Sequence, residues 1–232
     1  MLINADVFLA TVVSYRLVWI SGRFGGGKTS LAYRIAQEFL ERDYRLVTNN
    51  KSVWSDPIES IQLDENNHLK AVIILDEGGL WFKSSKQIEM VASYAAKMDC
   101  IYLLPSFWPP TRAAQVLVVQ PIFNFKRAGI PVVFYRWRVK IGSFEDKGFF
   151  IWWRPEEIYG IYSRQDPGDT GAEIVEFLIK RTEEFRERYG RGGSDSIQAM
   201  EVTSEDILSD AVNEFATAID GIATIPIRKR RR

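Results

Sequence analysis

Residues 22–29 carry the stretch that decides the fold, Gly22-Arg23-Phe24-Gly25-Gly26-Gly27-Lys28-Thr29. It matches the phosphate-binding pattern G-x-x-x-x-G-K-[ST] at every fixed position. A mostly apolar run of strand length, Tyr15 to Ile20, precedes it. After it, apolar side chains recur at helical spacing: Leu31, Ala32, Ile35, Ala36, Phe39 and Leu40. An ordinary glycine-rich turn needs no lysine and threonine here, so we predict a phosphate-binding loop between a strand and a helix.

The residue types of this loop suit a nucleoside triphosphate with its magnesium ion. Glycines allow successive backbone N–H groups to turn inward around the phosphates, and the following helix directs its positive end to the same place. Lys28 is expected to reach the β- and γ-phosphates, and the Thr29 hydroxyl to be a Mg²⁺ ligand. We therefore predict ATP and Mg²⁺ as cofactors. The predicted cofactor-binding residues are Gly22, Gly25, Gly26, Gly27, Lys28, Thr29 and Ser30.

A second informative stretch, Ala71 to Leu75, is a continuous apolar run that ends in Asp76-Glu77. Such a run indicates a buried parallel strand that delivers two carboxylates at its carboxyl end, where ligands of open α/β sheets bind. Asp76 is expected in the Mg²⁺ shell, directly or through water. Glu77 is expected to position and polarise the attacking water. We therefore predict that Lys28 and Glu77 are catalytic residues.

Polar residues follow two further predicted strands. Asn49 and Asn50 end the strand at 44–49, and each is interpreted either as a residue near the nucleotide or as part of a strand-ending turn. Ser106 follows the apolar run Cys100 to Leu104. It is a candidate γ-phosphate sensor, with ordinary loop chemistry after Pro105 as the alternative.

Composition limits the class of protein. The 232 residues suffice for one substantial domain, and 30 Lys plus Arg balance 30 Asp plus Glu, so any nucleic-acid site must be a local patch. A single cysteine, Cys100, and a single histidine, His68, exclude a disulfide framework and a Cys- or His-based zinc site. The apolar start, Val7 to Val13, is too short to span a bilayer. These features favour a soluble protein of a reducing compartment.

From 119 to 163 the hydrophobic period changes from that of a helix to that of a strand. In Phe134 to Ile141, one face carries Tyr135, Trp137, Val139 and Ile141, and the other carries Arg136, Arg138 and Lys140. Residues 142–148 are expected to form the turn and 149–153 the return strand. This pattern predicts an antiparallel β-hairpin added to the parallel sheet. Two interpretations of the cations stay open: contact with a phosphate backbone, or an exposed face made soluble by charge.

The last part of the chain is expected to lie outside the core. Residues 171–191 have the spacing of a helix that closes an ATPase domain of residues 1–191, and 192–200 are interpreted as a linker. Residues 201–232 are interpreted as a C-terminal amphipathic helix with a basic tail, Arg228 to Arg232. The tail is expected either to touch nucleic acid or acidic partners, or to be a solvated end.

These pieces together resemble the FtsK–HerA branch of P-loop ATPases, with the closest similarity to viral genome-packaging ATPases and Zot-like phage assembly ATPases. The resemblance rests on Gly22 to Thr29, on Val47-Thr48-Asn49-Asn50 and on Leu75-Asp76-Glu77-Gly78-Gly79-Leu80-Trp81-Phe82. It continues in Glu156-Glu157-Ile158-Tyr159-Gly160-Ile161-Tyr162-Ser163 and covers about residues 15–165.

The resemblance implies a RecA-like α/β core with a mostly parallel central sheet and helices on both faces. It implies ATP-driven movement of DNA by a homo-oligomeric ring, usually a hexamer, in the host cytoplasm or the virion, with capsid or portal proteins as partners. It also implies an arginine from the neighbouring subunit, for which Arg112 is the first candidate and Arg127 the second. Ser106 departs from the glutamine that such families often have. Zot-like proteins usually carry a membrane span, and none is visible here, which favours a packaging motor.

Three functional hypotheses follow. The first is a Mg²⁺-dependent ATP hydrolase that translocates DNA, with Arg136, Arg138, Lys140 and the Arg228–Arg232 tail as contacts. The second is a Zot-like assembly or adaptor ATPase that uses ATP as a switch and does not move DNA. The third, a kinase acting on a small molecule, is disfavoured because Asp76-Glu77 suits water activation and no arginine-rich lid is obvious.

Overall fold

A computed structural model of the chain describes residues 2–23, 25–65, 68–107, 117–127, 130–141, 144–153, 155–163 and 171–190. The first compact unit is Met1–Arg188, and a second unit begins at Tyr189. Within the described ranges, no helix is both long and apolar enough to cross a membrane. The predicted linker at 192–200 and the predicted helix and tail at 201–232 lie outside the described residues.

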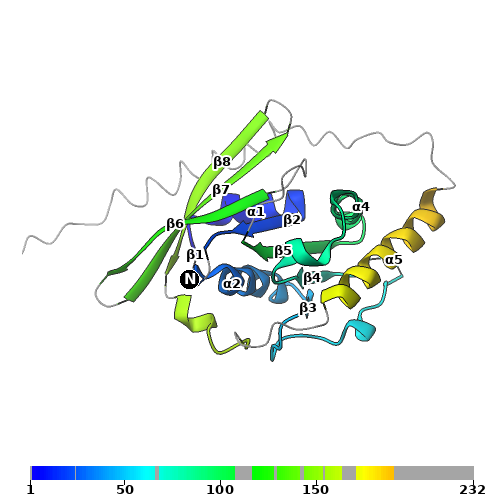
Figure 1. The fold of residues 1–232 in the computed structure, drawn as a ribbon, viewed down its shortest axis with the longest axis horizontal. Helices are drawn as coiled ribbons and strands as arrows, with labels where there is room; N and C mark the ends of the chain where they lie inside the picture. Colours follow the sequence, from blue (N-terminus) through cyan, green and yellow to red (C-terminus); the bar gives the residue numbers. More distant parts are fainter. Residues whose placement is uncertain are drawn as a thin grey trace, which may run out of the picture. The chain divides into compact units, whose positions relative to one another are not determined.

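Strands and helices follow each other along the chain as far as β5, after which β6, β7 and β8 follow in succession (Figure 1). The strands are β1 Leu2–Ile3, β2 Leu17–Ser21, β3 Arg45–Thr48, β4 Ala71–Ile74, β5 Cys100–Ser106, β6 Leu117–Arg127, β7 Ile130–Ile141 and β8 Phe144–Trp153. The helices are α1 Asp6–Tyr15, α2 Lys28–Leu40, α3 Gly78–Trp81, α4 Ser85–Ala95 and α5 Gly171–Gly190, with 3-10 turns η1 Ile58–Ser60 and η2 Pro155–Ile158.

All eight strands form one mixed sheet in the order β1-β8-β7-β6-β2-β5-β4-β3. The pairs from β6 to β3 are parallel, and the pairs from β6 to β1 are antiparallel. Strand β5 therefore lies between β2, which enters the glycine loop, and β4, which leads to Asp76. Parallel strands put their carboxyl ends at one edge, so the two predicted motifs meet at the same edge of the sheet.

Helices cover both faces of the parallel part, as expected for strands buried on both sides. Helices α1 and α2 pack on one face, and α4 and α5 on the other. The strands divide their side chains accordingly: Val18 and Ile20 of β2 belong to the first core, and Leu17 and Trp19 to the second. The prediction of an α/β fold with helices on both faces is confirmed.

The antiparallel part is larger than the hairpin that the sequence predicted. Strands β6, β7 and β8 are long, continue the main sheet, and end in a pairing with β1. The turn expected at 142–148 was wrong, because β8 already begins at Phe144 and pairs with β7 from Ile141 on. The expected alternation is confirmed where side chains are described: Tyr135 and Trp137 are buried, and Arg136 is exposed.

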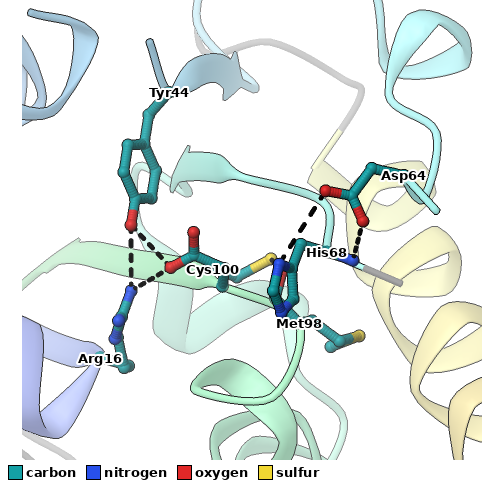
Figure 2. Close-up of polar contacts among 7 residues, drawn as sticks. Arg16, Tyr44, Asp64, His68, Met98 and Cys100 are labelled. Atoms are coloured by element: carbon teal, nitrogen blue, oxygen red, sulfur yellow. Dashed lines mark hydrogen bonds and ion pairs between the residues drawn. The ribbon is translucent and has the colours of Figure 1, made fainter. Parts of the chain in front are cut away.

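The amino ends of the parallel strands are held by a small polar cluster (Figure 2). Arg16, just before β2, donates from Nη1 to Asp99 Oδ1 at 2.8 Å, and the Tyr44 hydroxyl donates to the same oxygen at 2.6 Å. Asp99 directly precedes β5 and Tyr44 directly precedes β3. Figure 2 also draws the Cys100 thiol, which donates to the backbone oxygen of Met98 at 3.5 Å. This cluster ties three strand entrances together.

Candidate functional site

The glycine loop adopts a backbone that side chains would strain. Gly25 and Gly27 have φ values of +69° and +76°, in the left-handed region that favours glycine. The Gly26 amide donates to Arg23 O at 3.1 Å, and a Cβ at Gly26 would lie 2.9 Å from that same oxygen. Gly27 is the N-cap of α2, whose first residue is Lys28. The loop thus closes tightly on itself and delivers the lysine at the positive end of a helix.

Lys28 is buried and its ammonium folds back over the loop. Its side chain is 6% exposed, and Nζ donates to Arg23 O at 3.2 Å. An ammonium held against the loop stands where phosphates cradled by the loop would meet it.

Thr29 and Asp76 meet, although 47 positions separate them in the chain. The Thr29 hydroxyl lies 3.0 Å from each carboxylate oxygen of Asp76. Thr29 is in the first turn of α2, and Asp76 comes just after β4. A hydroxyl and a carboxylate at this distance are oxygen ligands of the kind that Mg²⁺ takes alongside phosphate oxygens and waters. The structure therefore brings the two predicted metal ligands together.

Two asparagines complete the surroundings of Asp76. Asn50 donates from Nδ2 to Asp76 Oδ2 at 3.3 Å. Asn49 pairs with the backbone of Asp76, accepting from its amide at 2.8 Å and donating to its carbonyl at 3.2 Å. Both are buried at the end of β3. Both asparagines lie in a bend that ends β3 and contact Asp76, while their place near a nucleotide stays a prediction.

The charge of Asp76 is not balanced by a cation in the described part of the chain. Its carboxylate accepts from the Thr29 hydroxyl, the Asn50 amide and the backbone amide of Glu77, and all three donors are neutral. No ion pair to Asp76 is formed there. A partly buried carboxylate surrounded by neutral donors can bind a cation.

Metal binding at this point would depend on the nucleotide. Among the described residues, no group of three or more His, Cys, Asp or Glu side chains is arranged to hold a metal ion. Magnesium fits such a place, since it keeps several waters and is commonly held by one or two carboxylates together with substrate phosphates. Asp76 and Thr29 would be the protein's share of that set.

Glu77 directly follows Asp76 after β4, and Ser106 ends the neighbouring strand β5. Glu77 is half-buried and has left-handed backbone angles, φ 53° and ψ 39°, which are uncommon for a residue with a side chain. Ser106 is buried at the end of β5, beside Ser21 of β2 in the parallel register. A Cβ at Gly79 would lie 3.2 Å from the Ser106 hydroxyl, so Ser106 also borders α3. Both residues lie at the edge of the sheet that holds the glycine loop.

Sequence reasoning assigned no role to Tyr162, which binds the first turn of α2. Its hydroxyl lies 2.8 Å from the Ser30 hydroxyl, and its ring stacks on Tyr33 with centroids 4.5 Å apart. Burial raises the pKa of Tyr33, whose hydroxyl donates to Thr48. The sequence feature that could have pointed to Tyr162 is the stretch from 156 to 163, because this stretch is part of the family resemblance. Ser30, placed in the cofactor-binding set, holds this segment through its side chain.

The antiparallel strands touch the glycine loop from its other side. A Cβ at Gly22 would lie 3.2 Å from Pro121 of β6, and one at Gly27 would lie 3.7 Å from the Tyr135 hydroxyl. Tyr135 is buried, which raises its pKa well above the ordinary value. The loop is therefore held between α2 and strands β6 and β7.

Other predicted residues lie apart from this site or outside the described residues. Arg112 and the Arg228–Arg232 tail are outside them. Arg127 ends β6, and Lys140 has a position near the end of β7, with only the backbone described for both. Arg136 and Arg138 are exposed on β7.

Comparison of the chain with protein-family models, with curated proteins and with solved structures found no match in any of the three. The function is therefore argued from the chemistry of the site.

Proposed function

We propose that this protein is a Mg²⁺-dependent ATP hydrolase with a RecA-like P-loop core, and that hydrolysis drives the movement of DNA. One observation carries the proposal: the Thr29 hydroxyl lies 3.0 Å from both oxygens of Asp76, directly after a glycine loop that ends in Lys28. The position of β5 between β2 and β4 supports the same core, since it aligns Ser106 with the glycine loop and the acidic strand end.

Each residue has a chemical task in this proposal. The loop amides and Lys28 bind the β- and γ-phosphates. Thr29 and Asp76 would hold Mg²⁺, which would supply positive charge to the phosphate oxygens. Glu77 holds a water in line with the γ-phosphorus and takes its proton as the new P–O bond forms and the bond to the β-phosphate oxygen breaks. Ser106 reads the γ-phosphate, while Asn49 and Asn50 fix the orientation of Asp76.

DNA movement rests on the family resemblance and on exposed cations of the antiparallel strands. Arg136 and Arg138 lie on one exposed face of β7, in the alternation that the sequence predicted. The proposed motor is a homo-oligomeric ring, hexameric by resemblance, that packages a viral genome. A neighbouring subunit would supply the arginine that stabilises the transferring phosphate, with Arg112 or Arg127 in that role.

The decisive experiment measures ATP hydrolysis and ATP binding in parallel. We expect Glu77→Gln to lower turnover by at least a hundredfold while ATP still binds, because only the water-positioning carboxylate is lost. Lys28→Ala is expected to abolish both turnover and tight binding. Full activity of the Glu77→Gln variant would remove Glu77 from the mechanism.

A second measurement separates the motor from a nucleotide switch. The full chain is assayed with and without single- and double-stranded DNA over a series of salt concentrations. A motor is expected to hydrolyse ATP faster with DNA, and this stimulation should fade as salt rises. Hydrolysis indifferent to DNA would instead favour the assembly or adaptor function.

A further inference from the structure

The face of β6, β7 and β8 that carries Arg136 has two adjacent rows of paired residues. In one row Gln120, Arg136 and Phe149 stand side by side, and in the next Arg138 stands beside Lys147. Directly opposed residues of an antiparallel pair share a face, and their Cβ atoms are about 5 Å apart. We call these five residues the outer strand face.

The outer strand face is open and positively charged. Phe149 is 60% exposed, and Arg136, Arg138 and Lys147 are exposed too. Arg136 donates to Gln120 at 3.1 Å, and none of the three cations forms an ion pair within the described chain. The nearest acid on the same face is Glu145, which is exposed in the following row opposite Lys140, whereas Asp146 stands between the two rows on the opposite face. One exposed phenyl ring therefore has three cations beside it, one directly opposite and two in the adjacent row.

This combination is unfavourable for the isolated chain. Like charges placed directly opposite each other, as Arg138 and Lys147 are, destabilise a strand pair. Because the phenyl side chain of Phe149 is largely exposed, it contributes little hydrophobic free energy to folding. A ligand with negative charges and flat aromatic faces would relieve both.

We propose that the outer strand face binds single-stranded nucleic acid. Phe149 stacks on an unpaired base, and Arg136, Arg138 and Lys147 contact backbone phosphates. The inference builds on the proposed DNA motor and specifies the strand state of its substrate. It adds Phe149 and Lys147, which the sequence pattern did not single out.

A single strand fits this face better than a duplex because of Phe149. In a duplex the bases are stacked on each other and offer only their edges in the grooves, so a flat phenyl ring on a sheet has no base face to meet. A single strand offers the face of every base, and stacking on an aromatic side chain tolerates any sequence. The sheet supplies the platform, and the cations beside the ring lie where the backbone would pass.

The test measures binding of labelled oligonucleotides to the full chain by fluorescence anisotropy. We expect single-stranded DNA to bind more tightly than the same sequence as a duplex. Phe149→Ala should weaken single-strand binding by roughly ten- to a hundredfold. Phe149→Tyr should retain binding and Phe149→Leu should not, because the aromatic face and not the apolar bulk is required. Val7→Ala, at a residue 56% exposed on α1, is the matched control.

Charge is tested separately by the salt dependence of binding. Each phosphate contact on a single strand contributes about 0.7 to the slope of log affinity against log salt. The double variant Arg138→Ala/Lys147→Ala should therefore lower that slope by about 1.4. Lys86→Ala, an exposed cation of α4, should leave it unchanged.

Three results would overturn the inference. These are tighter binding of duplex than of single strand, unchanged binding in Phe149→Ala, or a fall in particle mass in Phe149→Ala, which would make the face a contact between copies of the chain. ATP hydrolysis without DNA keeps the two proposals apart. Phe149→Ala should leave the rate of ATP hydrolysis without DNA unchanged, so a variant that loses binding and keeps this rate tests the outer strand face alone. If the parent chain binds DNA but never hydrolyses ATP, the motor proposal is contradicted and the binding proposal is not.

Discussion

At the amino ends of the parallel strands, Asp99 is paired with the guanidinium of Arg16 and the hydroxyl of Tyr44. At the carboxyl ends, the described residues offer Asp76 only neutral donors, among them Thr29 and Asn50. Both carboxylates tie together strands distant in sequence, but within the described part of the chain only Asp99 is paired with a cation. From this difference we infer that the amino-end cluster serves stability, and we propose that the carboxyl-end cluster keeps its negative charge for a ligand.

The sharpest test of this comparison is Asp76→Asn. The amide keeps the shape and can still accept from Thr29, but it removes the charge proposed to hold Mg²⁺. We expect ATP turnover to fall at least a hundredfold, with the free energy of unfolding within about 0.5 kcal/mol of the parent. Steady-state hydrolysis and thermal melting measure the two effects. A large loss of stability would show that Asp76 is mainly structural.

The matching change at the opposite end is Asp99→Ala. It leaves the Arg16 guanidinium and the Tyr44 hydroxyl without their shared acceptor, at a cost of about 1–3 kcal/mol. Turnover measured well below the melting temperature should stay unchanged. Asp64→Ala is the control. The exposed Asp64 carboxylate accepts from the His68 backbone amide at 2.8 Å and lies near its imidazole, so the effect of this change should be about 1 kcal/mol or less. Loss of activity without loss of stability in Asp99→Ala would break the comparison.

A smaller effect is expected from Tyr162→Phe. The ring still stacks on Tyr33, and only the hydrogen bond to Ser30 is lost, worth about 0.5–1.5 kcal/mol. A double-mutant cycle with Ser30→Ala isolates that bond, as long as each variant is measured by denaturant unfolding. If the losses of unfolding free energy in the two single variants add up to the loss in the double variant, the segment from 158 to 163 does not depend on this hydrogen bond.

The smallest effect is expected at high pH, at the amino end. Burial raises the pKa of the Cys100 thiol from 9.0 to about 12, so the folded chain favours the neutral form. The thiol's contribution to stability is complete below about pH 9 and is lost as pH rises from 9 to 12. Unfolding at a series of pH values measures this slope, and Cys100→Ala should flatten it. Rapid alkylation of Cys100 in the folded chain at pH 9 would contradict its burial.

The parts of the molecule that could be predicted were those whose sequence patterns are local. The glycine loop, the acidic strand end and the alternation of Tyr135 with Arg136 all appear within a few residues, and the described structure has the corresponding strands and helix. The meeting of the loop with Asp76 also followed, because parallel strands put their carboxyl ends at one edge.

The remaining parts depend on pairings that no local pattern contains. Residues 145–147 are Glu-Asp-Lys and resemble a turn, but they form a strand because β7 supplies opposing Lys140, Val139 and Arg138. Asn49 and Asn50 could not be assigned before β3 was known to pair with β4. Phe149 and Lys147 joined the basic residues of β7 only through the register.

The continuous hydrogen bonding from β2 through β6 to β8 has a mechanical consequence. Tension along β7 or β8 would be borne in shear by many ladder hydrogen bonds that must fail together, since β7 and β8 stay in register from Val132 to Ile141. The described register between β2 and β6 is much shorter, from Val18 to Ile20. Under a load on β7 or β8, the β2–β6 seam beside the glycine loop is therefore expected to yield before the β7–β8 pairing does.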